Sequence, residues 1–403
     1  MTPPSEPNSV NPAMDLSKTG SLVYQVTQEV QSGIADQAFW WGALAHPLAT
    51  LLRTSQYSQL DQLYYLRWFH KWVTPALGPR PIDGKPHYGA WLTYDGSCLE
   101  YSLNWKEKKP GQTVRFTIEP SSKDAGTAAD PLKQLAAREF LTAMAKDVPG
   151  IDMKRFDLFH SEICVPDDRA NEVQIKNPVG GPLTLVWVAF DLERGRIVAK
   201  AYFLPHMKAV LTGIPTKTIV FDAIRKCNGL GGSYDGSITA LNDYLESFPL
   251  DKAPQVVLLS NDCVADSPAC RNKVYVHASV GTLAHAKSMF HLGGRLSGET
   301  IAAGLRSVHD LWCHLFNLDS TDPDSENVVA LADGRLFLCV YEMRPTKGGD
   351  VSGGVDMEVK LHIPGWRLGK SDTEMSEMMR SWFRSHGDRE FAARYEPDLA
   401  SAL

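Results

Sequence analysis

Apolar and polar residues alternate in four pairs of neighbouring segments, and each pair predicts an antiparallel hairpin. The segments are residues 97–105 and 113–120, 183–192 and 196–205, 254–261 and 273–279, and 334–343 and 355–364. Because successive side chains of a strand point to opposite faces, each strand has one apolar and one polar face. The apolar faces suit packing against helices, so the polar faces are expected to lie together elsewhere.

Helical patterns separate the hairpins and complete a repeating unit. They cover residues 39–53 and 59–72, 131–146 and 153–159, 216–227 and 237–248, 282–290 and 297–316, and finally 371–386, followed by residues 388–403. Cations on the polar faces, at positions 115, 200, 273 and 360, recur at intervals of about 80 residues. The pattern predicts an α+β fold of repeated ααββ units, with antiparallel strands in a barrel, helices outside and polar faces lining a lumen.

A polar interior and an apolar exterior also describe a barrel of the bacterial outer membrane. The long helical connections disfavour that alternative, and no run approaches the roughly 18 apolar residues of a membrane helix. Residues 1–20 are rich in Pro, Ser and Asn and lack an apolar segment, so we expect a disordered tail without a signal peptide. We expect a cytoplasmic protein without membrane contact, built as a single domain over residues 21–403.

Composition narrows the function classes further. Hydrophobic residues make up 43% of the 403 residues, enough for a large core, and the seven cysteines are scattered and odd in number. The net charge is −6, and no block of like charges occurs. The electrostatic case for nucleic acid is therefore missing, and any anion must be bound by locally placed cations.

The predicted lumen combines cations with aromatic rings. Its cations are Arg115, Lys200, Arg271, Lys273 and Lys360. Cations in a protected chamber are costly unless an anion pairs with them, and this set suits a group with two or three charges such as diphosphate. Tyr202 and Tyr275 each follow a lysine by two residues, and Tyr341 is a further candidate for a ring face that stabilises a cation. Glu100, on a neighbouring polar face, can accept a hydrogen bond from a substrate N–H or O–H.

An anion site beside aromatic rings is what the ionisation of an allylic diphosphate requires. A metal-dependent isoprenyl synthase would perform that step in an all-helical fold with aspartate-rich motifs. The nearest match, Asp167-Asp168-Arg169-Ala170-Asn171, lacks the last acid and precedes a predicted strand, so we interpret it as a solvated loop. His309, Cys313 and His314 lack the usual zinc spacing, and no metal site is predicted.

Five sequence motifs follow one another along the chain. They are Leu92-Thr93-x-Asp95-Gly96-Ser97-x-Leu99-Glu100-Tyr101-Ser102-Leu103-Asn104-Trp105, Val114-Arg115-Phe116-Thr117-x-Glu119-Pro120, Lys200-Ala201-Tyr202-Phe203-Leu204-Pro205, Arg271-x-Lys273-x-Tyr275 and Gly293-Gly294-Arg295-Leu296. In this order they resemble the fungal aromatic (indole) prenyltransferases of the dimethylallyltryptophan synthase family. The resemblance implies a ten-stranded ABBA barrel. It also implies transfer of a prenyl group from dimethylallyl diphosphate, as co-substrate, to an aromatic acceptor without a metal or other cofactor.

By the same resemblance, individual residues acquire expected roles. The residues expected to bind diphosphate are Arg115, Lys200, Arg271 and Lys273. We add Lys360, because it is also expected to face the lumen. Tyr202 and Tyr275 correspond to the tyrosines that shield the allylic cation. His362 stands where a tyrosine is common, so we expect it to be neutral or directed at the diphosphate. Glu100 corresponds to the acid that binds the acceptor, and Leu92 corresponds to a wall of the acceptor pocket.

Two departures from the family pattern bear on the acceptor, which is an aromatic small molecule. Trp187 takes the position of a basic lysine in the enzymes that prenylate tryptophan at C4. No arginine that could bind an amino-acid carboxylate occurs near Val256 and Val257. We therefore place Trp187 in the acceptor pocket and favour an indole-containing or phenolic metabolite, such as a cyclic dipeptide or a xanthone, over free tryptophan.

The chain stops at Leu403, before the final hairpin that the resemblance implies. We therefore expect about eight strands and an open sheet edge. Either a partner chain covers this edge, for instance in a homodimer, or the lumen is open to water and activity is reduced. A second hypothesis is a non-catalytic barrel that binds an aromatic metabolite or an allylic diphosphate, and prenylated product would support only the enzyme.

Overall fold

A computed structural model describes residues 21–30, 33–105, 112–176, 184–229, 231–331, 337–347, 354–387 and 389–402. The predicted tail at residues 1–20 lies outside these ranges, as do the first residues of the strands predicted at 183–192 and 334–343. In the described part, no helix is both long and apolar enough to cross a membrane.

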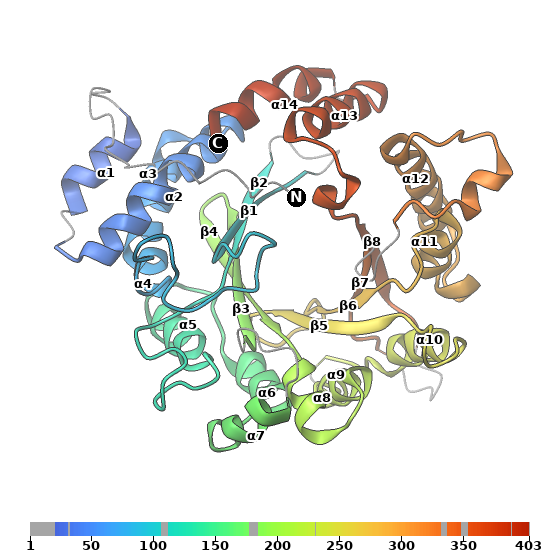
Figure 1. Ribbon diagram of the computed structural model, residues 1–403, viewed down its shortest axis with the longest axis horizontal. Helices are drawn as coiled ribbons and strands as arrows, with labels where there is room; N and C mark the ends of the chain where they lie inside the picture. Colours follow the sequence, from blue (N-terminus) through green and yellow to red (C-terminus); the bar gives the residue numbers. More distant parts are fainter. Residues whose placement is uncertain are drawn as a thin grey trace.

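Eight antiparallel strands form one sheet, in which each strand pairs with its neighbours in chain order. They are β1 (Leu99–Asn104), β2 (Thr113–Ile118), β3 (Val186–Glu193), β4 (Arg196–Phe203), β5 (Gln255–Asp262), β6 (Asn272–His277), β7 (Leu338–Met343) and β8 (Met357–His362). No pairing joins β1 to β8 in the described part of the chain. The sheet is therefore an open half-barrel with two free edges (Figure 1).

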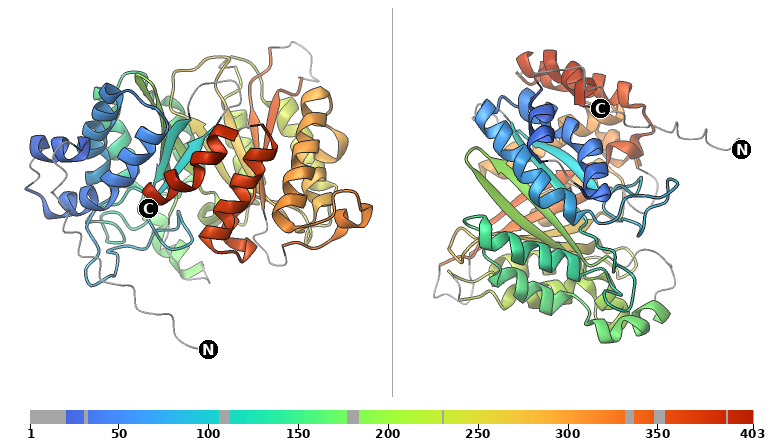
Figure 2. Two further views of the ribbon diagram at one scale, coloured as in Figure 1. Left: turned by 90° about the horizontal axis from the view of Figure 1, so that it is seen from above. Right: turned by 90° about the vertical axis from the view of Figure 1, so that its left-hand side faces the viewer.

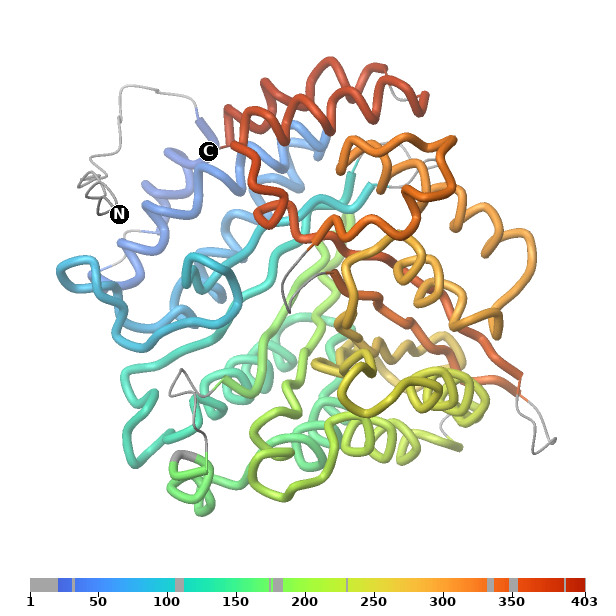
Figure 3. The backbone as a smooth tube through the Cα atoms, turned by 45° about the vertical axis from the view of Figure 1, so that its right-hand side comes forward, coloured from blue at the N-terminus to red at the C-terminus, as the bar shows by residue number. Residues whose placement is uncertain are grey.

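Helices precede each hairpin and lie on the outer side of the sheet, as the repeating pattern predicts (Figure 1). The helices before β1 are α1 (Leu22–Val30), α2 (Ala35–Thr54), α3 (Gln59–Trp68) and α4 (Thr74–Ala76), and those before β3 are α5 (Leu135–Asp147), α6 (Lys154–Ile163) and α7 (Ala170–Lys176). Before β5 come α8 (His206–Thr212), α9 (Thr216–Arg225) and α10 (Asp235–Glu246), before β7 come α11 (Leu283–Phe290) and α12 (Glu299–Phe316), and after β8 come α13 (Asp372–Ser385) and α14 (Arg389–Ala402). Figure 3 follows the same order around the sheet.

The hydrophobic core lies between the outer face of the sheet and the helices. On β2 and β3 the outward rings of Phe116 and Phe190 lie 5.3 Å apart. Phe116 is 5.4 Å from Phe69, and Phe190 is 5.0 Å from Trp68, which ends α3. The period of two along each strand thus delivers every second side chain to the helices and leaves the alternate ones facing the lumen.

The C-terminal helices α13 and α14 span the gap between the two sheet edges on the outside (Figure 2). His314 of α12 contacts the Met378 carbonyl of α13 at 2.9 Å, and Arg53 of α2 donates to Ser401 of α14 at 3.1 Å. Trp105, which follows β1, packs on Phe383 and Phe391 of these helices. The helical ring is thereby continuous, and a groove of about 680 Å³ remains between β1, α2 and the helix pair.

Three local predictions differ from the structure. The helix predicted at 59–72 ends as α3 at Trp68 and continues through a π-helical turn, Phe69–Val73, into α4. The short helix predicted at 153–159 continues as α6 to Ile163. The segment at Asp167–Arg169 is a short 3₁₀ helix that leads into α7, so the predicted loop is wrong.

The two faces of β2 predict different costs for substitutions at adjacent positions. We expect Phe116→Ala to lower the free energy of unfolding by about 3–5 kcal/mol, because truncation of a ring packed among other rings leaves a cavity. Thr117→Ala, on the lumen face, should cost less than about 1 kcal/mol. Denaturant unfolding of both variants measures the difference, and equal losses would contradict the assignment of the two faces.

Candidate active site

The antiparallel register brings charged residues of neighbouring strands side by side on the lumen face. The opposed pairs are Arg115 and Asp191, Lys200 and Asp262, and Lys273 and Glu342. The apolar outer face fixes the register of the strands, and this register also determines which charged residues are neighbours in the lumen. Each predicted cation of these strands therefore stands next to a carboxylate of the chain.

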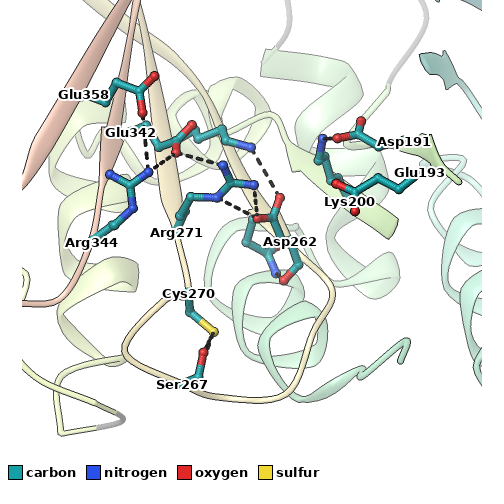
Figure 4. Close-up of polar contacts among 12 residues, drawn as sticks. Asp191, Glu193, Lys200, Asp262, Ser267, Cys270, Arg271, Glu342, Arg344 and Glu358 are labelled. Carbon is teal, nitrogen blue, oxygen red and sulfur yellow. Dashed lines mark hydrogen bonds and ion pairs between the residues drawn. The ribbon is translucent and has the colours of Figure 1, made fainter. Parts of the chain in front are cut away.

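Each of the five predicted cations forms an ion pair with one or two of three buried carboxylates, and Figure 4 shows the pairs of Lys200 with Asp191 and of Arg271 with Asp262 and Glu342. Asp191 contacts Lys200 and also Arg115, at 3.1 Å from its Nε atom. Arg271 donates from Nη2 to Asp262 at 2.6 Å and from Nη1 to Glu342 at 2.9 Å. The remaining pairs are Lys273 with Asp262 at 3.3 Å, Lys360 with Glu342 at 2.9 Å and Arg344 with Glu342 at 2.9 Å.

The structure thus brings all five predicted cations onto one face, but their partners were not predicted. Asp191, Asp262, Glu342 and the additional cation Arg344 follow the same period of two that selected the cations. The alternation along each strand is therefore the sequence signal from which these lumen positions can be predicted. The cations are neutralised by acids of neighbouring strands as well as being available to an external anion.

Burial shapes the protonation of this cluster. It lowers the pKa of Lys200 to about 8, although Asp191 opposes the shift. Burial also lowers the pKa of Lys273, again against a carboxylate, Asp262. Burial alone would raise the pKa of Asp262 and of Glu342, but the surrounding cations hold both below their ordinary values. The acids are therefore ionised, and the two lysines are the groups whose charge is most easily lost.

Three aromatic rings lie next to the cations on β4, β6 and β8. The Tyr202 and Tyr275 ring centres are 5.9 Å apart, and His362 meets Tyr275 at 6.4 Å with its ring perpendicular. Burial raises the pKa of both tyrosines, so they stay neutral phenols. The His362 side chain is exposed, but the protein atoms around it displace water and, with the nearby Lys360, lower its pKa, so we expect a neutral ring.

The candidate ring of Tyr341 does not face the lumen, so that prediction is wrong. Its hydroxyl donates to the Met289 carbonyl of α11 at 2.9 Å, and the side chain is fully buried in the core. On β7 the lumen face carries Val340 and Glu342, whose position alternates with that of Tyr341.

Glu100 lies on the lumen face of β1, at one end of a row that crosses the sheet. In register, Glu100 opposes Thr117, Thr117 opposes Ala189, and Ala189 opposes Lys200. Three strand spacings separate Glu100 from Lys200, or roughly 14 Å between their backbones. The Glu100 side chain is open to the lumen, and its carboxylate has no polar partner among the described residues. Protein atoms around it nevertheless displace enough water to raise the pKa of its carboxyl.

Trp187 and Leu92 come from two segments that meet at Glu119. Trp187 on β3 opposes Tyr202 in register and donates its indole N–H to Glu119 at 3.2 Å. Leu92 lies partly buried in the loop before β1, and the backbone N–H of the preceding Trp91 donates to Glu119 at 2.7 Å. Trp187 therefore adjoins Tyr202 on one side, and both predicted acceptor residues lie close to Glu119 on the other.

In the described ranges, no group of three or more His, Cys, Asp or Glu side chains is placed to hold a metal ion. Asp191, Asp262 and Glu342 are engaged with lysine and arginine instead.

Comparison with known proteins identifies the fold and the family. The sequence profile of the family Tryptophan dimethylallyltransferase matches residues 36–398. The chain is 50% identical over 382 residues to the prenyltransferase iacE of Pestalotiopsis fici, covering 94% of this chain and 86% of that protein. It is 28% identical over 358 residues to a 7-dimethylallyltryptophan synthase of Aspergillus fumigatus, covering 86% and 73%.

Solved structures share the architecture. AnaPT from Neosartorya fischeri superposes with a TM-score of 0.79 at 26% identity, covering 94% of this chain and 88% of that one. NotF, in complex with brevianamide F and DMSPP, superposes with a TM-score of 0.78 at 22% identity, covering 94% and 89%. The half-barrel, the lumen cluster and these matches agree with the motifs found in the sequence. The chain belongs to the tryptophan dimethylallyltransferase family of fungal aromatic prenyltransferases.

Proposed function

We propose that residues 21–403 act as one domain that transfers a dimethylallyl group from dimethylallyl diphosphate to an indole-containing or phenolic small molecule. The observation that best supports this proposal is that Glu100 and Lys200 lie on one row of opposed residues across the sheet. The Glu100 carboxylate at one end is unpaired, and Lys200 at the other end belongs to the buried cation cluster. Roughly 14 Å between the two backbones gives room for an aromatic acceptor and a five-carbon donor between their side chains.

The diphosphate is proposed to bind the cation cluster. Its ligands are Arg115, Lys200, Arg271, Lys273 and Lys360, with Arg344 at the edge. A diphosphate carries more charge than a carboxylate and offers more acceptor oxygens, so it competes for the same N–H groups. Arg271 supports this assignment because its guanidinium already bridges two acids on different strands. The five cations neutralise the leaving group in this proposal, and no metal ion is required.

The rings beside the cluster are proposed to shield the allylic cation. When the carbon–oxygen bond of the donor breaks, positive charge develops next to Tyr202, Tyr275 and His362. Each neutral ring face stabilises such a cation by about 0.5–2 kcal/mol. The lowered pKa of His362 keeps this third ring from adding a repelling charge.

Glu100 is proposed to bind and activate the acceptor. Its carboxylate accepts a hydrogen bond from the acceptor N–H or O–H, which raises the electron density of the ring that attacks the allylic carbon. As the new bond forms, Glu100 stabilises the positive charge on the acceptor and takes up its proton. Leu92 and Trp187 form the apolar walls, and the absence of a cationic residue at position 187 favours an acceptor without a free carboxylate.

Direct assay tests this function. The purified chain is incubated with dimethylallyl diphosphate, EDTA and a panel of tryptophan, cyclic tryptophan dipeptides, and xanthone and naphthalene phenols, and products are identified by mass spectrometry. We expect a gain of one prenyl unit on a cyclic dipeptide or a phenol, in the presence of EDTA. Activity that appears only after Mg²⁺ is added would contradict the metal-independent mechanism, and no product with any acceptor would contradict the function.

The lowered pKa of Lys200 predicts a pH dependence. Below about pH 8 Lys200 is charged and binds diphosphate, and above it the free enzyme loses this charge. We therefore expect kcat/KM for dimethylallyl diphosphate to fall as the pH rises through about 8, since this ratio reports the ionisation of the free enzyme. Lys200→Arg keeps its charge at every accessible pH and should remove this decline. An identical profile in both proteins would exclude Lys200 as the titrating group.

Glu100→Gln separates acceptor activation from diphosphate binding. We expect kcat to fall about 100-fold or more, because a neutral amide stabilises the developing charge less well than a carboxylate. Affinity for dimethylallyl diphosphate, measured by calorimetry, should not change. Glu246→Gln serves as the control, because Glu246 ends α10 and pairs with Lys217 of α9 in the outer helical layer. A full-speed Glu100→Gln enzyme would rule out the assigned role.

A further inference from the structure

Glu119 is a buried carboxylate that the proposed transfer chemistry does not use. It follows β2 on the lumen face, and its side chain is 1% exposed. Oε1 accepts hydrogen bonds from the Lys133 ammonium at 2.8 Å and from the Thr184 hydroxyl. Oε2 accepts from the Trp91 backbone N–H at 2.7 Å and from the Trp187 indole N–H at 3.2 Å. Four donors fill the acceptor capacity of one ionised carboxylate.

The donors come from segments that are far apart in the sequence. Trp91 belongs to the loop before β1, Lys133 precedes α5, and Thr184 and Trp187 stand at the start of β3. Glu119 therefore fixes the relative positions of the loop that carries Leu92 and of the strand that carries Trp187. Nothing else in the described residues bonds the Trp187 indole N–H.

The gain in stability from a buried ion pair is a weak reason to keep the Lys133–Glu119 pair in the fold. A buried ion pair contributes little net stability compared with apolar side chains of similar volume, because both charges lose their water. Lys133 also has a φ of 51°, a left-handed conformation that is strained for a residue with a side chain. Its ammonium lies 4.9 Å from the centre of the Tyr88 ring, which belongs to the same loop as Trp91. Strain and buried charge kept together in this way suggest a geometric function.

We infer that Glu119 is a positioning residue that sets the shape of the aromatic-acceptor pocket, an inference that rests on the proposed function. The hydrogen bond to Glu119 fixes the Trp187 indole in its plane beside Tyr202, so the lumen meets one defined ring surface. Because its N–H is already bonded, Trp187 offers the acceptor an apolar wall and no donor. The pocket therefore selects a flat, neutral aromatic acceptor whose only polar anchor is Glu100, and the wall decides which ring atom faces the allylic carbon.

Glu119→Gln tests the inference against a matched control. The amide nitrogen cannot accept a hydrogen bond, so the variant must release at least one donor. Asp266→Asn is the control, because Asp266 pairs with the equally buried Arg155 at 2.7 Å outside the lumen. Both variants should melt at a lower temperature. Only Glu119→Gln should weaken acceptor binding, by about tenfold, while affinity for dimethylallyl diphosphate stays within about twofold, and only it should alter the ratio of regioisomers.

Trp187→Phe provides a second test that leaves the Lys133–Glu119 pair intact. The variant keeps a flat ring and removes the N–H, so the regioisomer ratio should shift even if Glu119→Gln does not fold. Calorimetric affinities for the acceptor and for dimethylallyl diphosphate separate a pocket effect from a general loss of structure.

Each outcome decides something different. Unchanged acceptor affinity and product ratio in Trp187→Phe, or equal losses for both ligands in Glu119→Gln and Asp266→Asn, would overturn the inference alone. If the unmodified chain bound acceptor but formed no product, the proposed function would fail, while the acceptor affinities would still test Glu119. No acceptor binding by the unmodified chain would overturn both.

Discussion

Positive charge inside the lumen depends on carboxylates supplied by the chain itself. Asp191, Asp262 and Glu342 are buried, and each contacts two or more cations. A buried lysine without a partner would give up its proton or point elsewhere, because desolvation disfavours its charge. These pairs join β2, β3 and β4 through Asp191, and β5, β6, β7 and β8 through Asp262 and Glu342, so the cation cluster exists only while the antiparallel register holds. The register in turn depends on the apolar outer face that packs against the helices.

This pairing bears on how the proposed diphosphate site would bind its ligand. If the lumen cations had no carboxylate partners, they would bind anions without selectivity, and in the absence of an anion they would repel one another. Resident carboxylates instead keep the N–H groups oriented at little cost, and a ligand of higher charge exchanges with them. The bonds of Glu342 suit such exchange, since its partner Lys360 is 45% exposed. Glu119 represents the opposite case, because all four of its donors are fixed by the protein and its role is geometric.

Much of this could be read from alternation within single strands. The period of two identified the hairpins, separated the two faces and placed the five cations, Glu100 and the shielding rings on one side. Tyr341 has the opposite parity on β7, because Glu342 at the next position faces the lumen, so its ring packs in the core. The partners of Glu119 could not be predicted in this way. Lys133, Thr184 and Trp91 lie outside the strands, so their convergence depends on how loops cross the end of the barrel.

Exposure across the sheet suggests where each part of the reaction occurs. Lys200 and Lys273, on the middle strands, are 5% and 8% exposed, whereas Glu100 near one edge and His362 near the other are open. An allylic cation reacts with water when water reaches it, so its formation belongs in the middle of the sheet, beside Tyr202 and Tyr275. The open edge near Glu100 is then the side from which water must be excluded, and a flat acceptor held between Glu100 and Trp187 covers it. On this view, acceptor binding both supplies the nucleophile and closes the route by which water would compete with it.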